Sequence, residues 1–435
     1  MAIERFHVPQ EESLDRPALE QLQRAKLAAM LAEVLRTNRF YQRKLAGIPF
    51  DPAVDPIRTL PFTLRREIEA DQAATPLYGT NVTYPLERYT RVHQTSGTGG
   101  VPLRVLDTPE SWDWFKKLWG MIYTAAGIAP SESIFFPFSF GPFIGFWAAF
   151  EGGAARGNLC IPAGGVTTSA RLRMILDLGA AVICCTPTYA LHMAEVAKKE
   201  NIDLRRGKVR AFIVAGEPGG SIPAIRQQIE QAWSARVFDH TGMTEIGALS
   251  FECAQAPGGV HVAENEFIAE VVHPRTGEPA VPDAEGIEQG ELVLTNLGRW
   301  GWPLIRYRTG DVVRLSRGRC ACGRHFARLN GGIIGRVDDM IVVRGNNVFP
   351  SALDAILRSF PQVAEYQVIV SRANTMREIS IRVEPDDPAR AKDLPMLITR
   401  QMQDTLHWRC DVNLVPVGTL PRFELKARRW IRHDT

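Results

Sequence analysis

A segment rich in glycines and hydroxyls, Thr-Ser-Gly-Thr-Gly-Gly-Val-Pro at residues 95–102, carries the clearest chemical signal in this chain. It directly follows the β-prone run 89–93. Backbone N–H groups and hydroxyls in such a loop can surround phosphates. The segment is not a Walker A motif, because no Gly-Lys-Ser/Thr closes it. We therefore expect another way of holding a nucleoside triphosphate, although composition alone also fits a surface turn.

Three further segments could complete a nucleotide site. Residues 215–220 (Ala-Gly-Glu-Pro-Gly-Gly) follow an apolar run, where open α/β sheets bind ligands. Residues 239–245 (Asp-His-Thr-Gly-Met-Thr-Glu) offer a hydroxyl and a carboxylate, which suit phosphate and Mg²⁺. Residues 307–311 end on Asp311, whose carboxylate could hold a ribose diol. Taken singly, the three also fit a tight βα turn, a helix N-cap and a hairpin turn.

Two more motifs lie in the last hundred residues. Residues 335–350 begin Gly-Arg-Val-Asp-Asp-Met and end Asn-Val-Phe-Pro, where the composition shifts, so they could form a hinge. Residues 421–429 (Pro-Arg-Phe-Glu-Leu-Lys-Ala-Arg-Arg) form a basic loop that could handle an anion or be a solvated tail.

The order of these six motifs resembles the adenylate-forming superfamily of acyl-CoA synthetases and luciferases, and most of all its phenylacetate-CoA ligase branch. The resemblance runs from about residue 20 to the C-terminus. It implies an ATP-dependent, AMP-forming aryl-acid CoA ligase that makes an acyl-adenylate and then an acyl-CoA thioester. An adenylyltransferase, or an amide or carrier-protein ligase with the same first half-reaction, is the alternative enzyme. A non-catalytic nucleotide-binding or sensor protein is the alternative of another class.

Carried over residue by residue, the resemblance implies the following roles. The ATP phosphates would be cradled by Ser96, Gly97, Thr98 and Gly99, and the adenine side formed by Gly216, Glu217 and Pro218. Thr244 would face the α-phosphate and Glu245 would hold Mg²⁺. The ribose would be bound by Asp311, with Arg336 as a second ribose or phosphate contact. Asp338 would be the hinge, Lys426 would promote adenylation, and Gly345 would line the pantetheine tunnel of coenzyme A.

The sequence departs from the family pattern in two places. Many relatives have a tyrosine that stacks on adenine, whereas this chain has Thr241 at that position, preceded by His240. The phosphate loop also lacks the lysine that ends it in many relatives. Arg104 stands nearby in the sequence and could supply the positive charge.

The acid pocket must come from residues outside the nucleotide motifs. Residues 135–147 are unusually aromatic, and their position matches a segment that helps to form the acyl pocket in the phenylacetate branch. Aromatic walls suit a flat ring. We expect Phe138, Phe140 and Phe143 to line a pocket for a small aromatic carboxylic acid. Such a run could equally be ordinary core.

A structural Zn²⁺ site is a further expectation. Cys320 and Cys322 lie in one turn, and Cys253 and His261 lie upstream. Three thiolates and one imidazole make a closed tetrahedral set. His325 could replace His261 as the fourth ligand, and the alternative is a set of unrelated thiols and imidazoles.

Composition narrows the class of protein. A net charge of +3 over 435 residues gives no case for nucleic-acid or membrane-surface binding. The N-terminus lacks the apolar core of a signal peptide, and seven cysteines without such a signal are typical of thiols or metal ligands. We therefore expect a cytoplasmic protein. The resemblance adds a homodimer as the suggested oligomeric state.

The elements that must position these motifs can be read from the pattern of apolar residues. Helical spacing marks residues 19–45, and apolar runs at 181–185 and 211–214 alternate with helical patterns at 169–178, 189–200 and 223–234. This alternation predicts an α/β fold with a parallel, helix-covered sheet. Shorter strands from about residue 260 predict a small β-subdomain, followed by a compact α+β lid. We expect a large N-terminal adenylation domain over 1–335 and a mobile C-terminal domain over 336–435.

Overall fold

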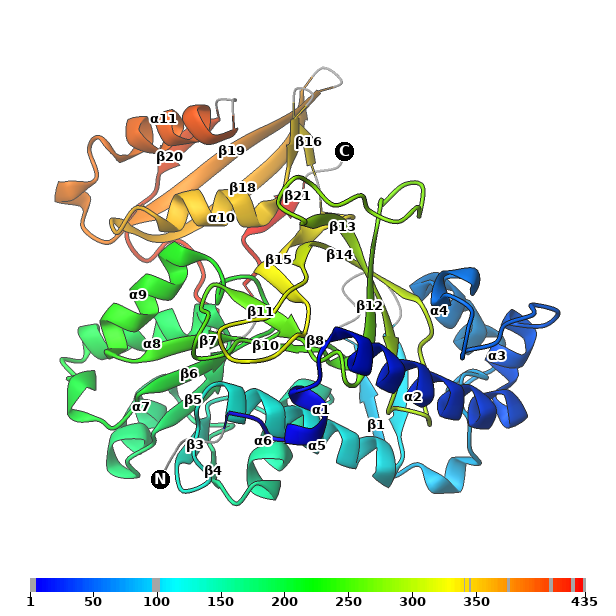
Figure 1. Cartoon of the computed structure of the whole chain (residues 1–435). Coiled ribbons are helices and arrows are strands. Elements are labelled where there is room, and N and C mark those ends of the chain that lie inside the picture. The colour runs from blue at the N-terminus through cyan, green and yellow to red at the C-terminus, as the bar shows by residue number, and fades with distance from the viewer. Residues whose placement is uncertain are drawn as a thin grey trace.

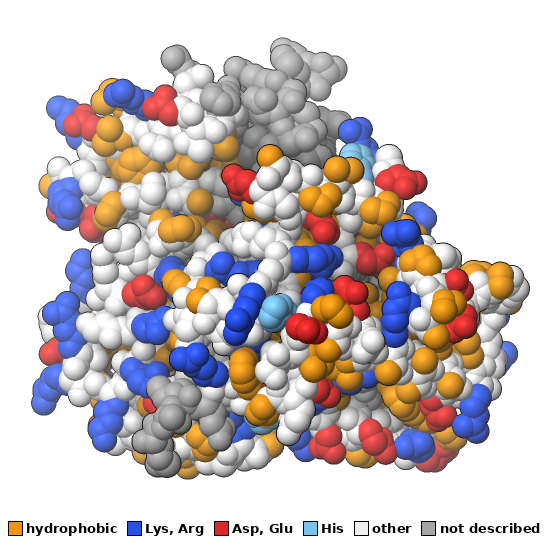
Figure 2. All heavy atoms as spheres, viewed as in Figure 1, with side chains coloured by type: hydrophobic (Ala, Val, Ile, Leu, Met, Phe, Trp, Pro, Cys, Tyr) orange, Lys and Arg blue, Asp and Glu red, His pale blue; other side chains and the backbone are white. Residues whose placement is uncertain are grey.

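The computed structural model describes residues 5–95, 102–339, 341–343, 346–373, 376–406, 410–423 and 427–432. Figure 1 shows a large lower part that holds most of the helices and two main sheets, and a smaller upper part formed by the C-terminal residues. On the face drawn in Figure 2, basic, acidic and hydrophobic side chains are all spread over the surface. Within the described residues, no helix has both the length and the apolar character needed to cross a membrane.

The first helices pack along one side of the large part. They are α1 (Pro9–Glu12), α2 (Arg16–Thr37), α3 (Arg39–Lys44) and α4 (Arg65–Ala74). Asp15 caps α2 by accepting the N–H of Ala18, and Asn38 caps α3 by accepting the N–H of Tyr41. These caps satisfy N–H groups that have no partner within a helix. The predicted helices over 19–45 are therefore confirmed as two helices that meet at Asn38.

A five-stranded parallel sheet forms one half of the large part, with the order β4-β3-β5-β6-β7. Its strands are β3 (Ser133–Phe136), β4 (Leu159–Pro162), β5 (Val182–Cys185), β6 (Ala211–Val214) and β7 (Arg236–Asp239). Alternate strand residues enter two separate apolar clusters, one shared with α5 (Pro109–Ala125) and α6 (Ile144–Ala155). The other cluster is shared with α7 (Thr168–Asp177), α8 (Pro187–Lys199) and α9 (Pro223–Trp233). Burial of both faces explains the continuous apolar runs.

A six-stranded antiparallel sheet packs beside it, in the order β10-β11-β15-β14-β13-β12. Its strands are β10 (Ser250–Phe251), β11 (Gly259–Val262), β12 (Phe267–Val272), β13 (Glu288–Asn296), β14 (Tyr307–Ser316) and β15 (Arg328–Arg336). Two hairpins flank the sheets, β1 (Arg91–Gln94) with β2 (Arg104–Asp107), and β8 (Gly242–Met243) with β9 (Gly247–Ala248). Short 3₁₀ turns cover Ile57–Thr59, Leu86–Arg88, Leu204–Arg206 and Pro388–Arg390.

The C-terminal residues form a smaller unit with its own apolar cluster. After the hairpin of β16 (Ile341–Val343) and β17 (Asn346–Val348), helix α10 (Pro350–Arg358) leads into β18 (Val363–Ala373) and β19 (Met376–Pro385). Helix α11 (Leu394–Leu406) and the short strands β20 (Asp411–Leu414) and β21 (Trp430–Arg432) follow. The sheet order is β20-β19-β18-β21, and both outer strands pair in parallel. The predicted α+β character is confirmed, whereas the two outer strands were not predicted.

A fully buried ion pair ties the hairpin β1–β2 to the rest of the large part. The guanidinium of Arg299 donates two hydrogen bonds of 2.7 Å to Asp107, and neither side chain has exposed surface. Arg299 also donates to the carbonyl oxygens of Thr244 (2.8 Å) and Glu245 (3.0 Å). Burial by itself would raise the pKa of Asp107, but the charge of Arg299 outweighs it and holds that pKa below its ordinary value.

Replacing Asp107 with Asn should destabilise the fold by about 3–5 kcal/mol, because it leaves the buried Arg299 charge uncompensated. Urea unfolding followed by circular dichroism measures the loss. Since the carboxylate has a lowered pKa, the stability that it adds is present at neutral pH and is lost as the pH falls.

The matched control is Glu20→Gln, which removes an exposed ion pair with Arg16 on α2. This substitution should lower the free energy of unfolding by less than about 0.5 kcal/mol. Equal unfolding midpoints for Asp107→Asn and the unmodified chain would show that the buried pair adds nothing to stability.

Candidate active site

The turns that follow β6 and β7 lie next to each other, because these two parallel strands are neighbours in the sheet. The turn after β6 contains Gly216, Glu217 and Pro218, and the segment after β7 contains His240, Thr241, Thr244 and Glu245. Ser221 donates a hydrogen bond to Asp239 at the end of β7, which links the two segments. Adjacent loops at the carboxyl edge of a parallel sheet are where such folds bind ligands.

Glu245 is buried and is held by an arginine that the sequence motifs did not single out. Its carboxylate lies 2.6 Å from a guanidinium nitrogen of Arg65, near the start of α4. Arg65 also donates to the hydroxyl of Thr95 at 3.3 Å, the residue that opens the glycine-rich segment. Arg104, by contrast, donates to the carbonyl oxygen of Leu77 at 3.1 Å. Arg65 therefore brings positive charge to a loop that lacks a lysine, and it was missed because it belongs to no motif.

The segment after β7 is a small hairpin, so the alternative reading as a helix N-cap is wrong. The ring of His240 is buried and its Nδ1 lies 2.6 Å from the carbonyl oxygen of Ser250. Burial lowers the pKa of His240 to about 4, so the ring is neutral at pH 7. It meets Trp119 edge to face with ring centroids 4.7 Å apart. The hydroxyl of Thr241 is hydrogen-bonded to that of Ser250.

Asp311 and Arg336 are direct partners across two strands. They lie opposite each other in the pairing of β14 with β15, and their side chains form an ion pair of 3.0 Å. Asp311 does not follow a hairpin turn, so that alternative is also wrong. The pairing of β14 with β13 shifts over residues 309–311, where Gly310 has a φ of 75°. This irregularity in β14 presents Asp311 beside Arg336.

Glu217 contacts both parts of the molecule. One carboxylate oxygen accepts the N–H of Thr188 on α8 at 2.8 Å, and the other accepts the N–H of Ala427 at 2.9 Å. Gly216 has a φ of 96°, a conformation that favours glycine. The turn after β6 is therefore a contact point for the C-terminal unit.

The aromatic segment packs largely on itself. Phe138 is buried, stacks on Phe146 with ring centroids 4.0 Å apart, and meets Phe140 edge to face at 5.4 Å. Phe140 and Phe143 are half-buried. The backbone here also contacts the phosphate-loop hairpin, since Gln94 donates its N–H to the carbonyl oxygen of Pro142 at 3.1 Å.

Four predicted metal ligands converge at the side of the antiparallel sheet. The ligand atoms of Cys253, His261, Cys320 and Cys322 all lie within 4.8 Å of one another. Cys253 Sγ lies 3.8 Å from Cys320 Sγ, and His261 Nε2 lies 3.6 Å from Cys322 Sγ. The other ring nitrogen of His261 lies 3.2 Å from the carbonyl oxygen of Phe326. Among the described residues the group contains His261, and His325 is not part of it.

Several predicted site residues lie outside the described residues. These are Ser96, Gly97, Thr98, Gly99, Gly345 and Lys426. Asp338 is described and exposed, in the turn after β15 where Asp339 donates its N–H to the carbonyl oxygen of Arg336 at 3.2 Å.

Comparisons with known proteins identify the relatives of this chain. Residues 345–433 match the AMP-binding enzyme C-terminal domain. A phenylacetate-coenzyme A ligase of Thermus thermophilus is 32% identical over 444 residues, covering 96% of this chain and 97% of that protein. The phenylacetate-coenzyme A ligase of Escherichia coli is 29% identical over 425 residues, which cover 94% of each protein.

Solved structures of a 2-hydroxyisobutyryl-CoA ligase, 27% identical, add information on conformation. Its postadenylation state with 2-HIB-AMP has a TM-score of 0.93 and covers 100% of this chain and 94% of that one. Its thioesterification state with 2-HIB-AMP and CoA has a TM-score of 0.74 and covers 99% of this chain and 93% of that one. The arrangement of the present chain is therefore closer to the postadenylation state. With the identity and coverage found for the Thermus protein, the chain belongs to the phenylacetate-CoA ligase family of AMP-forming acid-thiol ligases.

Proposed function

We propose that this chain activates an aromatic carboxylic acid with ATP and transfers the acyl group to coenzyme A. The observation that carries the proposal is that two ion pairs, Glu245 with Arg65 and Asp311 with Arg336, both lie near enough to Tyr307 to act on its hydroxyl electrostatically, in a member of this family. The aromatic segment that contains Phe138, Phe140 and Phe143 supports an aryl acid as the substrate. The names of the bacterial relatives, which are phenylacetate-coenzyme A ligases, point the same way.

The first half-reaction joins two anions. A carboxylate oxygen of the acid attacks the α-phosphorus of ATP, and the bond to the pyrophosphate oxygen breaks. Negative charge that develops there needs fixed cationic donors. We assign Thr244 to the α-phosphate and Lys426 to the attacking carboxylate. Arg65 adds positive charge beside the phosphate loop, and Asp311 with Arg336 would bind the ribose and orient the nucleotide.

Mg²⁺ fits the carboxylate of Glu245, because carboxylate and phosphate oxygens are its preferred ligands. When bound, Mg²⁺ would neutralise phosphate charge. Arg65, which lies 2.6 Å from Glu245, occupies this position in the structure and would share the carboxylate with the ion.

The second half-reaction needs a different arrangement of the C-terminal unit. The thiolate of coenzyme A attacks the acyl carbon, the bond from that carbon to the oxygen that bridges it to phosphorus breaks, and AMP leaves with the bridging oxygen. We propose that residues 336–435 rotate against residues 1–335 about Asp338, which withdraws Lys426 and admits the thiol along Gly345. The two states of the 2-hydroxyisobutyryl-CoA ligase, which differ in their similarity to this chain, support such a rotation.

The four-residue cluster of Cys253, His261, Cys320 and Cys322 suits a structural Zn²⁺. Zn–S bonds of about 2.3 Å and Zn–N bonds of about 2.0 Å in a tetrahedron place two sulfurs about 3.8 Å apart, and a sulfur and a nitrogen about 3.5 Å apart. The observed Sγ–Sγ and Nε2–Sγ distances are 3.8 Å and 3.6 Å. The backbone contact of the other His261 nitrogen would fix the ring, as is common at metal sites.

The substrate is tested by pyrophosphate release with ATP and Mg²⁺, with and without coenzyme A, across phenylacetate, benzoate, anthranilate, indole acids and 2-hydroxyisobutyrate. Mass spectrometry identifies the products. We expect a thioester from one aryl acid. A thioester from 2-hydroxyisobutyrate alone would exclude the aryl specificity. Acyl-AMP without any thioester would mean that the acceptor is an amine, a phenol or a carrier protein.

Lys426→Ala and Asp338→Pro should affect opposite half-reactions. Loss of the lysine should slow adenylation on the order of 100- to 1,000-fold, as for removal of one transition-state donor, and spare thioester formation from supplied acyl-adenylate. Proline at 338 should restrict the hinge backbone, spare adenylation and slow thioester formation. The two half-reactions are assayed separately for each variant. Loss of both half-reactions in either variant would contradict its assignment.

Elemental analysis of the purified protein should give about one zinc per chain. Cys320→Ser should lower that ratio and the melting temperature. Cys160→Ser, at a half-buried thiol outside the cluster, should leave the zinc content unchanged. A folded protein without zinc would contradict the proposed metal site.

A further inference from the structure

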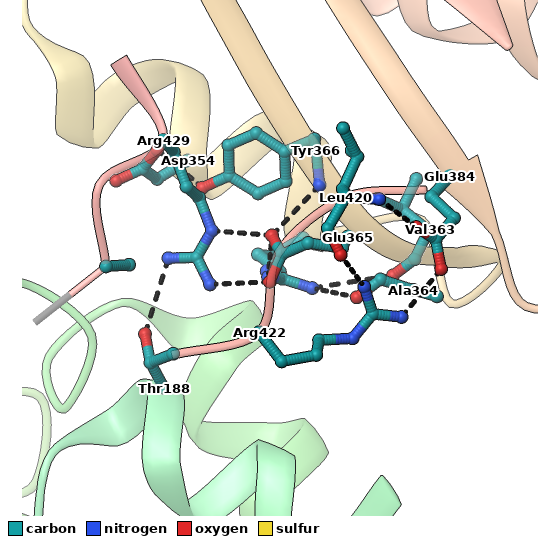
Figure 3. A network of polar contacts seen from close by, with 12 residues as sticks. Thr188, Asp354, Val363, Ala364, Glu365, Tyr366, Glu384, Leu420, Arg422 and Arg429 are labelled. Carbon is teal, nitrogen blue, oxygen red and sulfur yellow. Dashed lines mark hydrogen bonds and ion pairs between the residues drawn. The ribbon is translucent and has the colours of Figure 1, made fainter. Parts of the chain in front are cut away.

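Polar contacts from the last segment help to hold the C-terminal unit against the large part, in addition to a hydrogen bond of 2.7 Å from Gln228 of α9 to the carbonyl oxygen of Arg358 on α10. In the described parts of residues 410–432, Arg422 pairs with Glu195 of α8 at 2.9 Å, and Arg429 donates to the hydroxyl of Thr188 at 3.3 Å. Figure 3 shows Arg422 and Arg429 in this network, with Thr188 reaching up from the large part. The third contact is the N–H of Ala427, which donates to Glu217.

These contacts differ in strength. The Arg422–Glu195 pair is partly exposed, with Glu195 at 49%, so solvent screens it. Arg429 directs two hydrogen bonds to Glu365 within its own unit and reaches Thr188 only at the longer distance. The Glu217 contact is charge-assisted and short.

Glu217 is well placed to act as a fixed acceptor. Its first oxygen accepts the N–H of Thr188, close to the N-terminus of α8, whose cap is Thr186. An N–H group there has no partner within the helix, and the helix dipole favours a negative charge. The helix therefore holds the carboxylate in place and leaves its second oxygen for Ala427.

The interface around these contacts is not closely packed. A cavity of about 510 Å³ lies between α8, α9 and the C-terminal unit, and its lining includes His192, Glu195, Arg358 and Arg422. Helix α10 packs against α9 and β15 in another part of this interface, but beside the cavity the last segment is not held by close apolar packing. The position of the last segment here depends on individual polar contacts, so loss of the Glu217 contact should disturb that position.

We infer that Glu217 is a positioning residue for the adenylation half-reaction. The N–H that it accepts belongs to the peptide bond that joins Lys426 to Ala427, and this bond is planar. The contact therefore restrains the backbone at Ala427, which directly follows the lysine assigned to the attacking carboxylate. The contact joins the two units, so it must break when the C-terminal unit rotates. The inference rests on the proposed function, and it adds to the adenine-side role of the turn a role in docking the lysine segment.

The test is Glu217→Gln, with Glu195→Gln as the matched control at the same interface. Glutamine keeps the size of the side chain but replaces one acceptor oxygen with an NH₂ group, which cannot accept an N–H. In Glu217→Gln, kcat of adenylation at saturating ATP should fall about 10- to 100-fold, as for loss of a hydrogen bond to a charged group. Thioester formation from supplied acyl-adenylate should not fall. The control should change either rate less than about threefold.

Hydrogen exchange in the nucleotide-free enzyme gives a readout that does not depend on activity. The peptide that contains Ala427 should exchange faster in Glu217→Gln than in the unmodified chain, and at an unchanged rate in Glu195→Gln. Loss of both half-reactions, a defect only in KM for ATP, or unchanged exchange at Ala427 would overturn the inference. Absence of adenylation by the unmodified enzyme with every acid would instead refute the proposed function, while the exchange experiment would still report on the docking contact.

Discussion

The buried ion pair of Arg299 and Asp107 fixes the backbone of the candidate site at Thr244 and Glu245. Two charges with no exposed surface are stable in the interior only if each has its partner in good geometry, and here both hydrogen bonds measure 2.7 Å. The same guanidinium holds the backbone carbonyls of Thr244 and Glu245. The residues assigned to the α-phosphate and to Mg²⁺ therefore sit on a backbone anchored by a core interaction, and Arg65 then orients the Glu245 side chain. One buried network therefore joins the core of the fold to the backbone of the residues proposed for catalysis.

The C-terminal unit is stabilised internally and attached to the large part by different kinds of contact. It has an apolar cluster of its own, whereas polar contacts beside a cavity join its last segment to the large part. A unit with its own core can keep its fold while it changes orientation, and a polar interface can separate at low cost. A separate core in the C-terminal unit and a polar interface at its last segment suit an enzyme that runs two half-reactions at one site. The chain is more similar to the postadenylation state than to the thioesterification state of the 2-hydroxyisobutyryl-CoA ligase, and in the proposed mechanism this arrangement would be the first of the two orientations.

Much of the scaffold could be predicted from the sequence because local patterns determine it. The buried strands β5 and β6 appear as apolar runs, and α7 before β5 and α8 between the two strands have helical spacing. Each of these helices starts after a threonine cap, and α8 begins with a proline. The turn after β6 could be located because it follows such a run. The thiols of Cys320 and Cys322 could be recognised from their shared turn.

The remaining features depend on contacts between distant residues. Arg65 meets Glu245 across 180 positions, and no local pattern distinguishes it from other surface arginines. His261 joins the cysteines only because β11 pairs with β15, which carries the cysteine turn on its preceding loop. The short outer strands β20 and β21 are too brief and too polar to predict, since long-range pairing with β19 and β18 creates them. The irregularity at Gly310 likewise arises from the pairing of three strands.

Exchange of radiolabelled pyrophosphate into ATP, measured without coenzyme A, tests the central claim most directly. The exchange occurs only if the enzyme forms an acyl-adenylate reversibly. We expect exchange that requires an aryl acid and Mg²⁺ and that is lost when Lys426 is replaced. Thioester formation without acid-dependent exchange would contradict the adenylate mechanism, and exchange that persists without Lys426 would contradict the role given to the C-terminal unit.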